Sequence, residues 1–375
     1  MLRSLRNLLV NIIAAFIRDS EARHKFRNRY KRKSKFRKLR DDNKQLISSM
    51  GKILNDIQTI KSQLAAQKEK YDSLTTDLVM LERERSHIFR VTPLDSLPPQ
   101  KSDDEVLLAI TCVAKNEGPY LREWIEYHKI VGVERFYFYD NESDDNTKEI
   151  LEPYIKDGTV VYHLLHNHPI VKQVPQEEAY NDAIFRYRDS TKWMAIIDAD
   201  EFIVPVEKNT ITEFLADYEQ YPGVVANWVN FDSNGYEKRA TEHGGLITAN
   251  YTRVRKERNN ALDRDVKTIV NPKKVVYFTI HYGLYYHNFS AVTENFEKAR
   301  GQNTKVHSSK KIRINHYRVK SREEYVNRII KNSKNNSSLI YKLHEGMINF
   351  TQETDVDLVI QKYVPELKIA LGIKD

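Results

Sequence analysis

The sequence predicts an α/β domain with a mainly parallel sheet, preceded by a long helical segment. Two observations support this prediction. Between residues 105 and 200, short apolar runs alternate with amphipathic segments, and over residues 46–81 apolar side chains recur every three or four positions. The first pattern is typical of strands covered by helices, and the second is typical of a helix that pairs with other helices.

Seven consecutive segments carry the alternation. Apolar, β-branched or aromatic runs predict strands, and apolar residues three or four apart predict helices. In order, the segments are strand 106–114, helix 120–132, strand 135–140, helix 146–155, strand 159–165, helix 177–190 and strand 193–198. Strands separated by helices usually pair in parallel, so their carboxyl ends share the edge where ligands of open α/β sheets bind.

The first 40 residues hold much of the positive charge. They contain 14 lysines and arginines against two acidic residues, while the whole chain has a formal net charge of +8. Their apolar run, residues 7–17, is roughly half of what crosses a bilayer as a helix. We expect an in-plane helix and a basic arm on an anionic membrane surface, at the cytoplasmic face rather than in a Golgi-type lumen. A signal peptide or a solvated tail is the alternative.

Residues 41–89 are predicted to form a coiled coil. Apolar residues step by four and three, with Met50, Ile57 and Leu64 at position a and Ile53 and Ile60 at position d. Isoleucine at d disfavours a clean dimer, so we expect a homo-oligomer without specifying its order. A single amphipathic helix that folds back on the following domain is the alternative.

Composition sets the remaining boundaries and excludes some classes. Residues 90–104 contain three prolines and form a linker, residues 105–335 form the globular domain, and residues 336–375 form a C-terminal helical extension. The single cysteine, Cys112, excludes an intrachain disulfide framework. Beyond the N-terminal arm the chain is slightly acidic, which argues against a nucleic-acid partner.

An acidic pair, Asp198 and Asp200, stands at the end of an apolar strand. Alternate residues of an extended chain point the same way, so both carboxylates can address one divalent cation. Mn²⁺ and Mg²⁺ prefer carboxylate, phosphate and water oxygens, which suits a nucleotide-diphosphate substrate. A solvated loop or a helix cap also fits the D-x-D pattern alone. Two further polar clusters at strand ends, Asn116–Glu117 and Asp140–Asn141, are expected to converge on the same crevice.

Four sequence motifs occur in order within residues 106–335. They are CVAKNEGPYLREWIEYHKIVGVERFYFYDNESDDN, KWMAIIDADEFIVP, VKTIVNP and INHYRVKSREEY. Together they resemble glycosyltransferase family 92 and its bacterial family 2-like relatives. The resemblance implies an A-type nucleotide-sugar-binding fold, a divalent cation, and inverting transfer of a hexose from a UDP-sugar to a cell-surface glycan. Galactose is the sugar that the resemblance favours.

Position in these motifs assigns roles to individual residues. Those expected around the nucleotide-sugar are Asn116, Glu117, Asp140, Asn141, Gln176, Asn181, Asp198 and Lys267. Those expected at the metal are Asp198, Asp200 and His316. Asp200 is the first metal ligand, while Asp198 serves the metal, the ribose or a bound water. A core histidine is the alternative for His316, and a solvated cation is the alternative for Lys267.

Inverting transfer needs a carboxylate base within reach of the acceptor hydroxyl. Asp232 lies where acceptor-side residues are expected, although relatives often have glycine there, and Glu201 is the second candidate. Two other functions fit parts of the sequence. One is a membrane-tethered coiled-coil scaffold with a non-catalytic transferase-like domain. The other is a nucleotidyltransferase, which would usually carry a glycine-rich phosphate loop that is missing here.

Overall fold

A computed structural model describes eight stretches of the chain. They are residues 44–45, 47–70, 73, 105–166, 175–256, 263–286, 289–332 and 353–374. The chain divides into two units, residues 1–74 and residues 75–375, and each is described by itself. The predicted membrane-surface segment and the predicted linker lie outside the described residues.

In the described residues of the first unit, a helix runs over residues 47–70. Its predicted a and d side chains, which are Met50, Ile53, Ile57, Ile60 and Leu64, are between 47% and 65% exposed. The helix is therefore confirmed, and it presents an apolar seam, but the structure shows no second helix against this seam among the residues it describes. No helix in the described stretches combines the length and the apolar character needed to span a bilayer.

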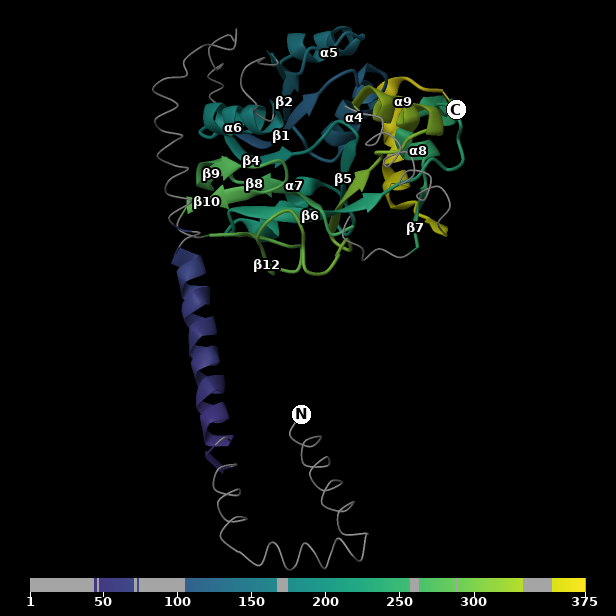
Figure 1. Cartoon of the computed structure of the whole chain (residues 1–375). Helices are drawn as coiled ribbons and strands as arrows, with labels where there is room; N and C mark the ends of the chain where they lie inside the picture. The colour runs from purple at the N-terminus through teal and green to yellow at the C-terminus, as the bar shows by residue number, and fades with distance from the viewer. Residues whose placement is uncertain are drawn as a thin grey trace, which may run out of the picture. The chain divides into compact units, whose positions relative to one another are not determined.

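The second unit is built on a mixed sheet of ten strands, counted over the described residues (Figure 1). Its strands are β1 (Val106–Ala114), β2 (Arg135–Asp140), β3 (Val160–Leu164), β4 (Thr191–Ile196), β5 (Glu201–Pro205), β6 (Gly223–Asn230), β8 (Val266–Val270), β11 (Ala291–Val292), β12 (Lys298–Ala299) and β13 (Ile312–His316). Two small sheets pair β7 (Arg253–Arg255) with β14 (Thr354–Val356), and β9 (Val275–Phe278) with β10 (Gly283–Tyr285). The α-helices among the described residues of this unit are α4 (Gly118–Ile130), α5 (Thr147–Lys156), α6 (Pro175–Tyr187), α7 (Ile211–Leu215), α8 (Ile247–Asn250), α9 (Arg322–Asn332) and α11 (Val364–Leu371).

Apolar side chains of the central strand point to two cores because successive strand residues face opposite sides of a sheet. Leu108, Ile110 and Cys112 of β1 join the core that also contains residues of α4 and α5. Ala109 of the same strand joins the core beneath α6. Burial on both faces explains why β1 is an almost continuous apolar run.

The seven predicted segments between residues 105 and 200 are confirmed as β1, α4, β2, α5, β3, α6 and β4. The strand pairs β1–β2, β2–β3 and β1–β4 are parallel, as expected. The rest of the sheet is mixed, because β8 runs antiparallel between β4 and β6, and β5 runs antiparallel to β13. This antiparallel part places later segments of the chain beside the β4–β5 turn.

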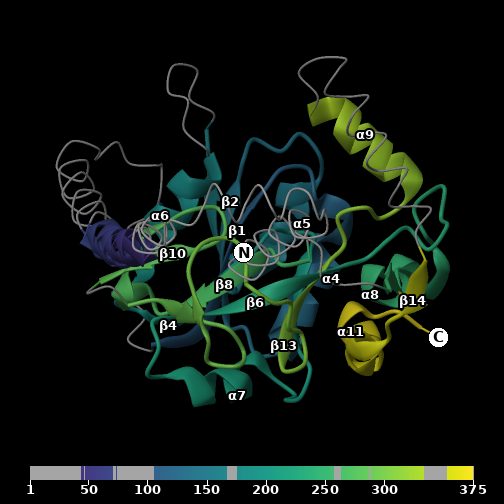
Figure 2. The same cartoon turned by 60° about the horizontal axis from the view of Figure 1, so that its bottom comes forward.

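Residues 336–375 are predicted to form a C-terminal helical extension, of which residues 336–352 lie outside the described residues. Its described part, residues 353–374, supplies β14 to the small sheet with β7, and α11, which packs on α4. Figure 2 shows β14 and α11 close to α8. Ile360 and Leu367 are buried in the core that contains α4, so this segment belongs to the globular domain.

Candidate active site

The loops that follow β1 and β2 are joined by hydrogen bonds at the carboxyl edge of the sheet. The backbone N–H of Asn116 donates to Ser143 Oγ at 2.9 Å, and the N–H of Asp144 donates to Asn116 Oδ1 at 2.8 Å. Between them the chain passes Gly118, where a Cβ atom would lie only 2.3 Å from Asn146 Oδ1. The two strand-end loops therefore pack closely at Gly118, and their predicted convergence with Asp198–Asp200 on one crevice stays a prediction.

Predicted nucleoside residues shape these loops. Buried Asp140 accepts hydrogen bonds from the N–H of Ser143 at 2.8 Å and from the Tyr162 hydroxyl at 2.7 Å. The Asn141 amide donates to the carbonyl of Leu165 at 3.1 Å. These bonds fix the loop after β2, and contact of Asp140 or Asn141 with a nucleoside stays a prediction.

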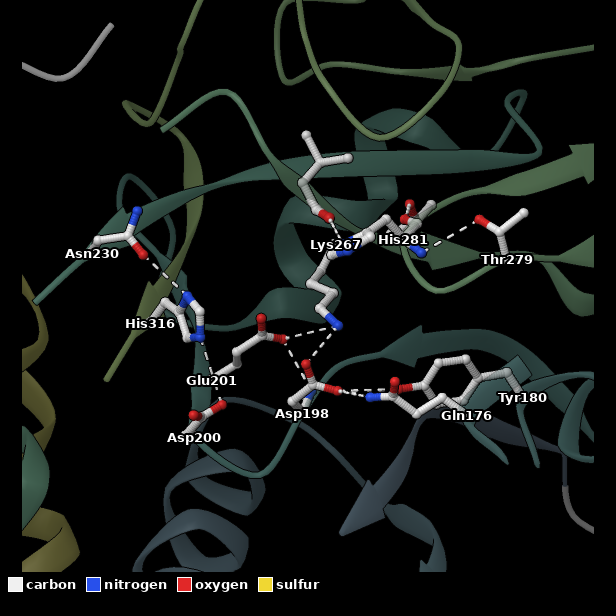
Figure 3. Close-up of polar contacts among 12 residues, drawn as sticks. Gln176, Tyr180, Asp198, Asp200, Glu201, Asn230, Lys267, Thr279, His281 and His316 are labelled. Atoms are coloured by element: carbon white, nitrogen blue, oxygen red, sulfur yellow. Dashed lines mark hydrogen bonds and ion pairs between the residues drawn. The ribbon is translucent and has the colours of Figure 1, made fainter. Parts of the chain in front are cut away.

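Asp198 lies just after β4 and is held by three side chains. Its Oδ2 accepts from Lys267 Nζ at 2.9 Å, and its Oδ1 accepts from Tyr180 at 3.1 Å and from Gln176 at 3.3 Å (Figure 3). Sheet register explains the first contact, because β8 pairs Thr268 with Ile196 of β4. Gln176 therefore contacts Asp198, and its predicted contact with the donor stays a prediction.

Lys267 is a buried cation between two acids. Its side chain is 1% exposed, and its Nζ lies 2.9 Å from Asp198 Oδ2 and 3.7 Å from Glu201 Oε2. Burial alone would lower the pKa of the ammonium, but the two carboxyl groups outweigh that effect and raise it. In this structure Lys267 therefore neutralises the acidic cluster, and it is not a solvated cation. Its predicted contact with the donor phosphate stays a prediction.

Glu201, the first residue of β5, is completely buried. Its Oε2 accepts the backbone N–H of Asp198 at 2.9 Å, which fixes the turn between the two aspartates. Burial raises the pKa of this carboxyl, although neighbouring Lys267 opposes the shift. The geometry supports a role for Glu201 in holding the turn.

Asp200 faces a different set of partners from Asp198. Its Oδ1 lies 3.7 Å from His316 Nε2, and its Oδ2 lies 3.1 Å from Arg328 Nη1. Burial raises the pKa of the Asp200 carboxyl, but His316 and Arg328 outweigh burial and hold the pKa at about 2. The two aspartates of the motif therefore have different partners: Asp198 is paired with Lys267, while Asp200 is paired with Arg328 and faces His316.

His316 ends β13, which places it beside Asn230 of β6 and Glu201 of β5 in the sheet register. Its Nδ1 lies 3.0 Å from Asn230 Oδ1, and Asn230 Nδ2 lies 3.4 Å from Asp263 Oδ1. The second contact needs an amide nitrogen facing Asp263, so the Asn230 oxygen accepts a hydrogen from His316 Nδ1. Figure 3 shows the other ring nitrogen, Nε2, facing Asp200, and with the hydrogen on Nδ1 this nitrogen carries the lone pair.

The Asp200–His316 pair suits a divalent cation. Burial lowers the pKa of His316 to about 4, so the ring is neutral near neutral pH and its Nε2 can ligate. A carboxylate oxygen and an imidazole nitrogen 3.7 Å apart can both reach a cation placed between them, and this donor set fits Mn²⁺. The described residues contain no group of three or more acids, histidines or cysteines able to hold a metal. Phosphate and water oxygens would complete the shell.

Other predicted residues lie apart from the acidic pair or have structural partners. Asn181 holds β9, because it donates to the carbonyl of Phe278 and accepts its N–H at 2.7 and 2.8 Å. Glu117 accepts from Lys320 Nζ at 2.9 Å, which links the loop after β1 to the segment after β13. Half-buried Asp232 follows β6 and accepts the N–H of Asn234 at 2.7 Å.

The predicted site residues do not include Asn230, which contacts His316, or Arg328, which contacts Asp200. Both contacts join residues more than 80 positions apart. Asn230 occurs in the strand-like run NWVN, and Arg328 in the helical run REEYVNRIIKN. Neither run carries a sequence signal that separates these residues from ordinary surface polar residues.

Comparison with known proteins places this site in a family. The glycosyltransferase family 92 model matches residues 109–359. A family 92 protein of Oryza sativa subsp. japonica is 32% identical over 117 residues, which cover 31% of this chain and 19% of that protein. A galactan β-1,4-galactosyltransferase of Arabidopsis thaliana is 28% identical over 172 residues, which cover 43% of this chain and 32% of that protein.

These curated relatives are matched over less than a third of their own length. Among solved structures, S. aureus TarS in complex with UDP-GlcNAc is 13% identical with a TM-score of 0.31, over 71% of this chain and 88% of that chain. The family model carries the assignment, because it spans the strand-end loops, the acidic pair and His316. The chain belongs to glycosyltransferase family 92.

Proposed function

We propose that the protein is a metal-dependent, inverting hexosyltransferase that moves galactose from a UDP-sugar to a cell-surface glycan. The observation that carries the proposal is the Asp200–His316 pair in a family 92 domain. The similarity to a galactan β-1,4-galactosyltransferase of Arabidopsis thaliana supports galactose as the sugar and a galactan-like acceptor. Nothing in the arrangement favours the scaffold or the nucleotidyltransferase.

Different residues of the site are proposed to bind different parts of the donor. Asp200 and His316 would hold the cation, and a bound Mn²⁺ or Mg²⁺ would stabilise the negative charge of the departing diphosphate. Asp198, fixed by Lys267, is available to a ribose hydroxyl or a bound water. The joined loops after β1 and β2 would receive the nucleoside, with Asp140 and Asn141 closest to it.

Transfer itself is an in-line displacement. The acceptor hydroxyl oxygen forms a bond to the anomeric carbon while the bond from that carbon to the diphosphate breaks, and the hydroxyl proton passes to a carboxylate. Of the two candidate bases, we favour Asp232. It is only half-buried and burial raises its pKa, which strengthens it as a base, whereas Glu201 is completely enclosed.

Asp232→Asn is expected to lower kcat by about 10²–10⁴-fold, the usual contribution of a general base. Affinity for UDP should stay the same, because Asp232 is assigned to the acceptor side. Product formation by chromatography and UDP binding by calorimetry check both parts. The matched control is exposed Asp217→Asn on another part of the surface. An unchanged kcat in Asp232→Asn would reject this residue as the base.

A donor and acceptor panel tests the function itself. The purified full chain with Mn²⁺ is incubated with UDP-galactose, UDP-glucose, UDP-N-acetylglucosamine or GDP-mannose, with and without β-1,4-galacto-oligosaccharides. The proposal predicts galactose transfer from UDP-galactose and a β-linkage by NMR, which is inversion of the α-linked donor. The proposal is wrong if the protein neither hydrolyses any of these donors nor transfers a sugar from any of them.

We also propose that the N-terminal unit tethers and assembles the enzyme. The exposed seam of helix 47–70 is expected to pair with a second copy of itself, and residues 1–40 are expected to bind anionic lipid at the cytoplasmic face of a membrane. Ile57→Lys in the seam should convert oligomers to monomers in analytical ultracentrifugation and leave flotation with phosphatidylserine vesicles intact. If the unmodified chain is monomeric, the proposed assembly is wrong. If the unmodified chain does not float with the vesicles at low salt, the proposed membrane binding is wrong.

A further inference from the structure

Both aspartates of the acidic pair already hold a cationic side chain. Asp198 is paired with Lys267 at 2.9 Å, and Asp200 is paired with Arg328 at 3.1 Å. A divalent cation at Asp200 would sit about 2.0–2.2 Å from a carboxylate oxygen. A guanidinium on the same carboxylate would then repel it, so one of the two must give way.

The two cations differ in their freedom to move. Lys267 is 1% exposed and lies between two acids on the central sheet, so it stays in place. Arg328 is 33% exposed and lies on α9, with its guanidinium 5.9 Å from the Tyr325 ring centre. Arginine also has a planar fork that matches phosphate oxygens better than a single carboxylate oxygen.

We propose that Arg328 is a resident counter-ion of Asp200 that transfers to the diphosphate of the donor when cation and donor bind together. The inference rests on the proposed function, because it needs a diphosphate substrate. In the donor-free protein Arg328 neutralises Asp200 and weakens binding of the cation alone. When the diphosphate is present, it supplies the negative charge that receives Arg328, and Asp200 is released to the cation.

Arg328 therefore couples two binding events. A cation should bind more tightly when UDP is present, and by linkage UDP should bind more tightly when the cation is present, by the same factor. Removing the guanidinium takes away both the competition at Asp200 and the contact with the diphosphate. The first loss should tighten binding of the cation alone, and the second should reduce the enhancement of cation binding by UDP. A merely structural ion pair would not produce these two opposite changes.

The test titrates MnCl₂ into the full chain by calorimetry, with and without saturating UDP, in the unmodified protein and in Arg328→Gln. We expect Mn²⁺ alone to bind about tenfold more tightly to Arg328→Gln, and the enhancement by UDP to fall by about tenfold, within the usual range of such couplings. The matched control is Arg322→Gln on the same helix, which removes a cation paired with Glu237 and should change neither value.

A second variant, Arg328→Lys, keeps the inference testable if Arg328→Gln does not fold. Arg328→Lys keeps the charge and loses the fork, so it should bind Mn²⁺ alone like the unmodified protein and show a reduced enhancement by UDP. Circular dichroism checks that both variants are folded. If folded Arg328→Gln binds Mn²⁺ alone no more tightly than the unmodified protein, the inference is wrong. If the unmodified chain binds neither Mn²⁺ nor UDP, the proposed function fails instead.

Discussion

Asp200→Ala is expected to lower the rate of galactose transfer by about 10³-fold or more. The substitution removes one of the two protein ligands offered to the cation, and with it the electrostatic stabilisation of the departing diphosphate. Losses of about 10²–10³-fold follow removal of a single hydrogen-bond donor to developing charge, and loss of a metal site should be at least as large. Initial rates with UDP-galactose and Mn²⁺ measure the effect.

Two comparisons make this result specific. Asp217→Ala removes an exposed carboxylate elsewhere on the domain and should transfer at the unmodified rate. The fold of Asp200→Ala should be retained, because the N–H of Tyr317 bonds to the backbone carbonyl of Asp200 at 2.9 Å and not to its side chain. Transfer by folded Asp200→Ala within tenfold of the unmodified rate would show that Asp200 holds no essential cation.

Lys267→Met is expected to destabilise the globular domain by about 3 kcal/mol. Methionine keeps most of the buried volume but leaves two acids without their cation, and breaking a buried ion pair on one side typically costs about 3–5 kcal/mol. The lower end applies because Asp198 is 28% exposed and regains some hydration. Urea unfolding followed by tryptophan fluorescence measures the free energy of unfolding.

Removing the charge of Asp198 as well should restore part of the lost free energy of unfolding. The double variant Lys267→Met with Asp198→Asn is expected to be more stable than Lys267→Met alone, since the remaining amide needs no counter-ion. Lys273→Met is the matched control, because it removes an exposed lysine paired with Glu105 and should cost less than about 1 kcal/mol. Equal stability of Lys267→Met and Lys273→Met would mean that Lys267 does not balance the acids.

The sequence was sufficient to predict the first half of the α/β domain. β1 and β4 are apolar runs buried on both faces, and the helices between them have apolar residues at helical spacing. Each element could therefore be recognised from its own residues. The convergence of Asn116 with the loop after β2 followed from the rule that parallel strands share a carboxyl edge.

The second half of the site depends on strand order, which local pattern does not encode. Lys267 contacts Asp198 because β8 is inserted antiparallel beside β4, and His316 contacts Asn230 because β13 joins β6. The same limit applies to the C-terminal segment, where β14 pairs with β7 about 100 positions earlier in the chain. Local periodicity could predict a helix there, but not that the segment completes the core.

The central claim is that Asp200 and His316 bind the donor through a divalent cation. Calorimetric titration of UDP into the full chain, first with Mn²⁺ and then with the chelator EDTA, tests it most directly. The account predicts binding that is present with Mn²⁺, at least tenfold weaker with EDTA, and equally weak in Asp200→Ala under both conditions. Equal UDP affinity with and without Mn²⁺, or full Mn²⁺-dependent affinity in Asp200→Ala, would contradict the account.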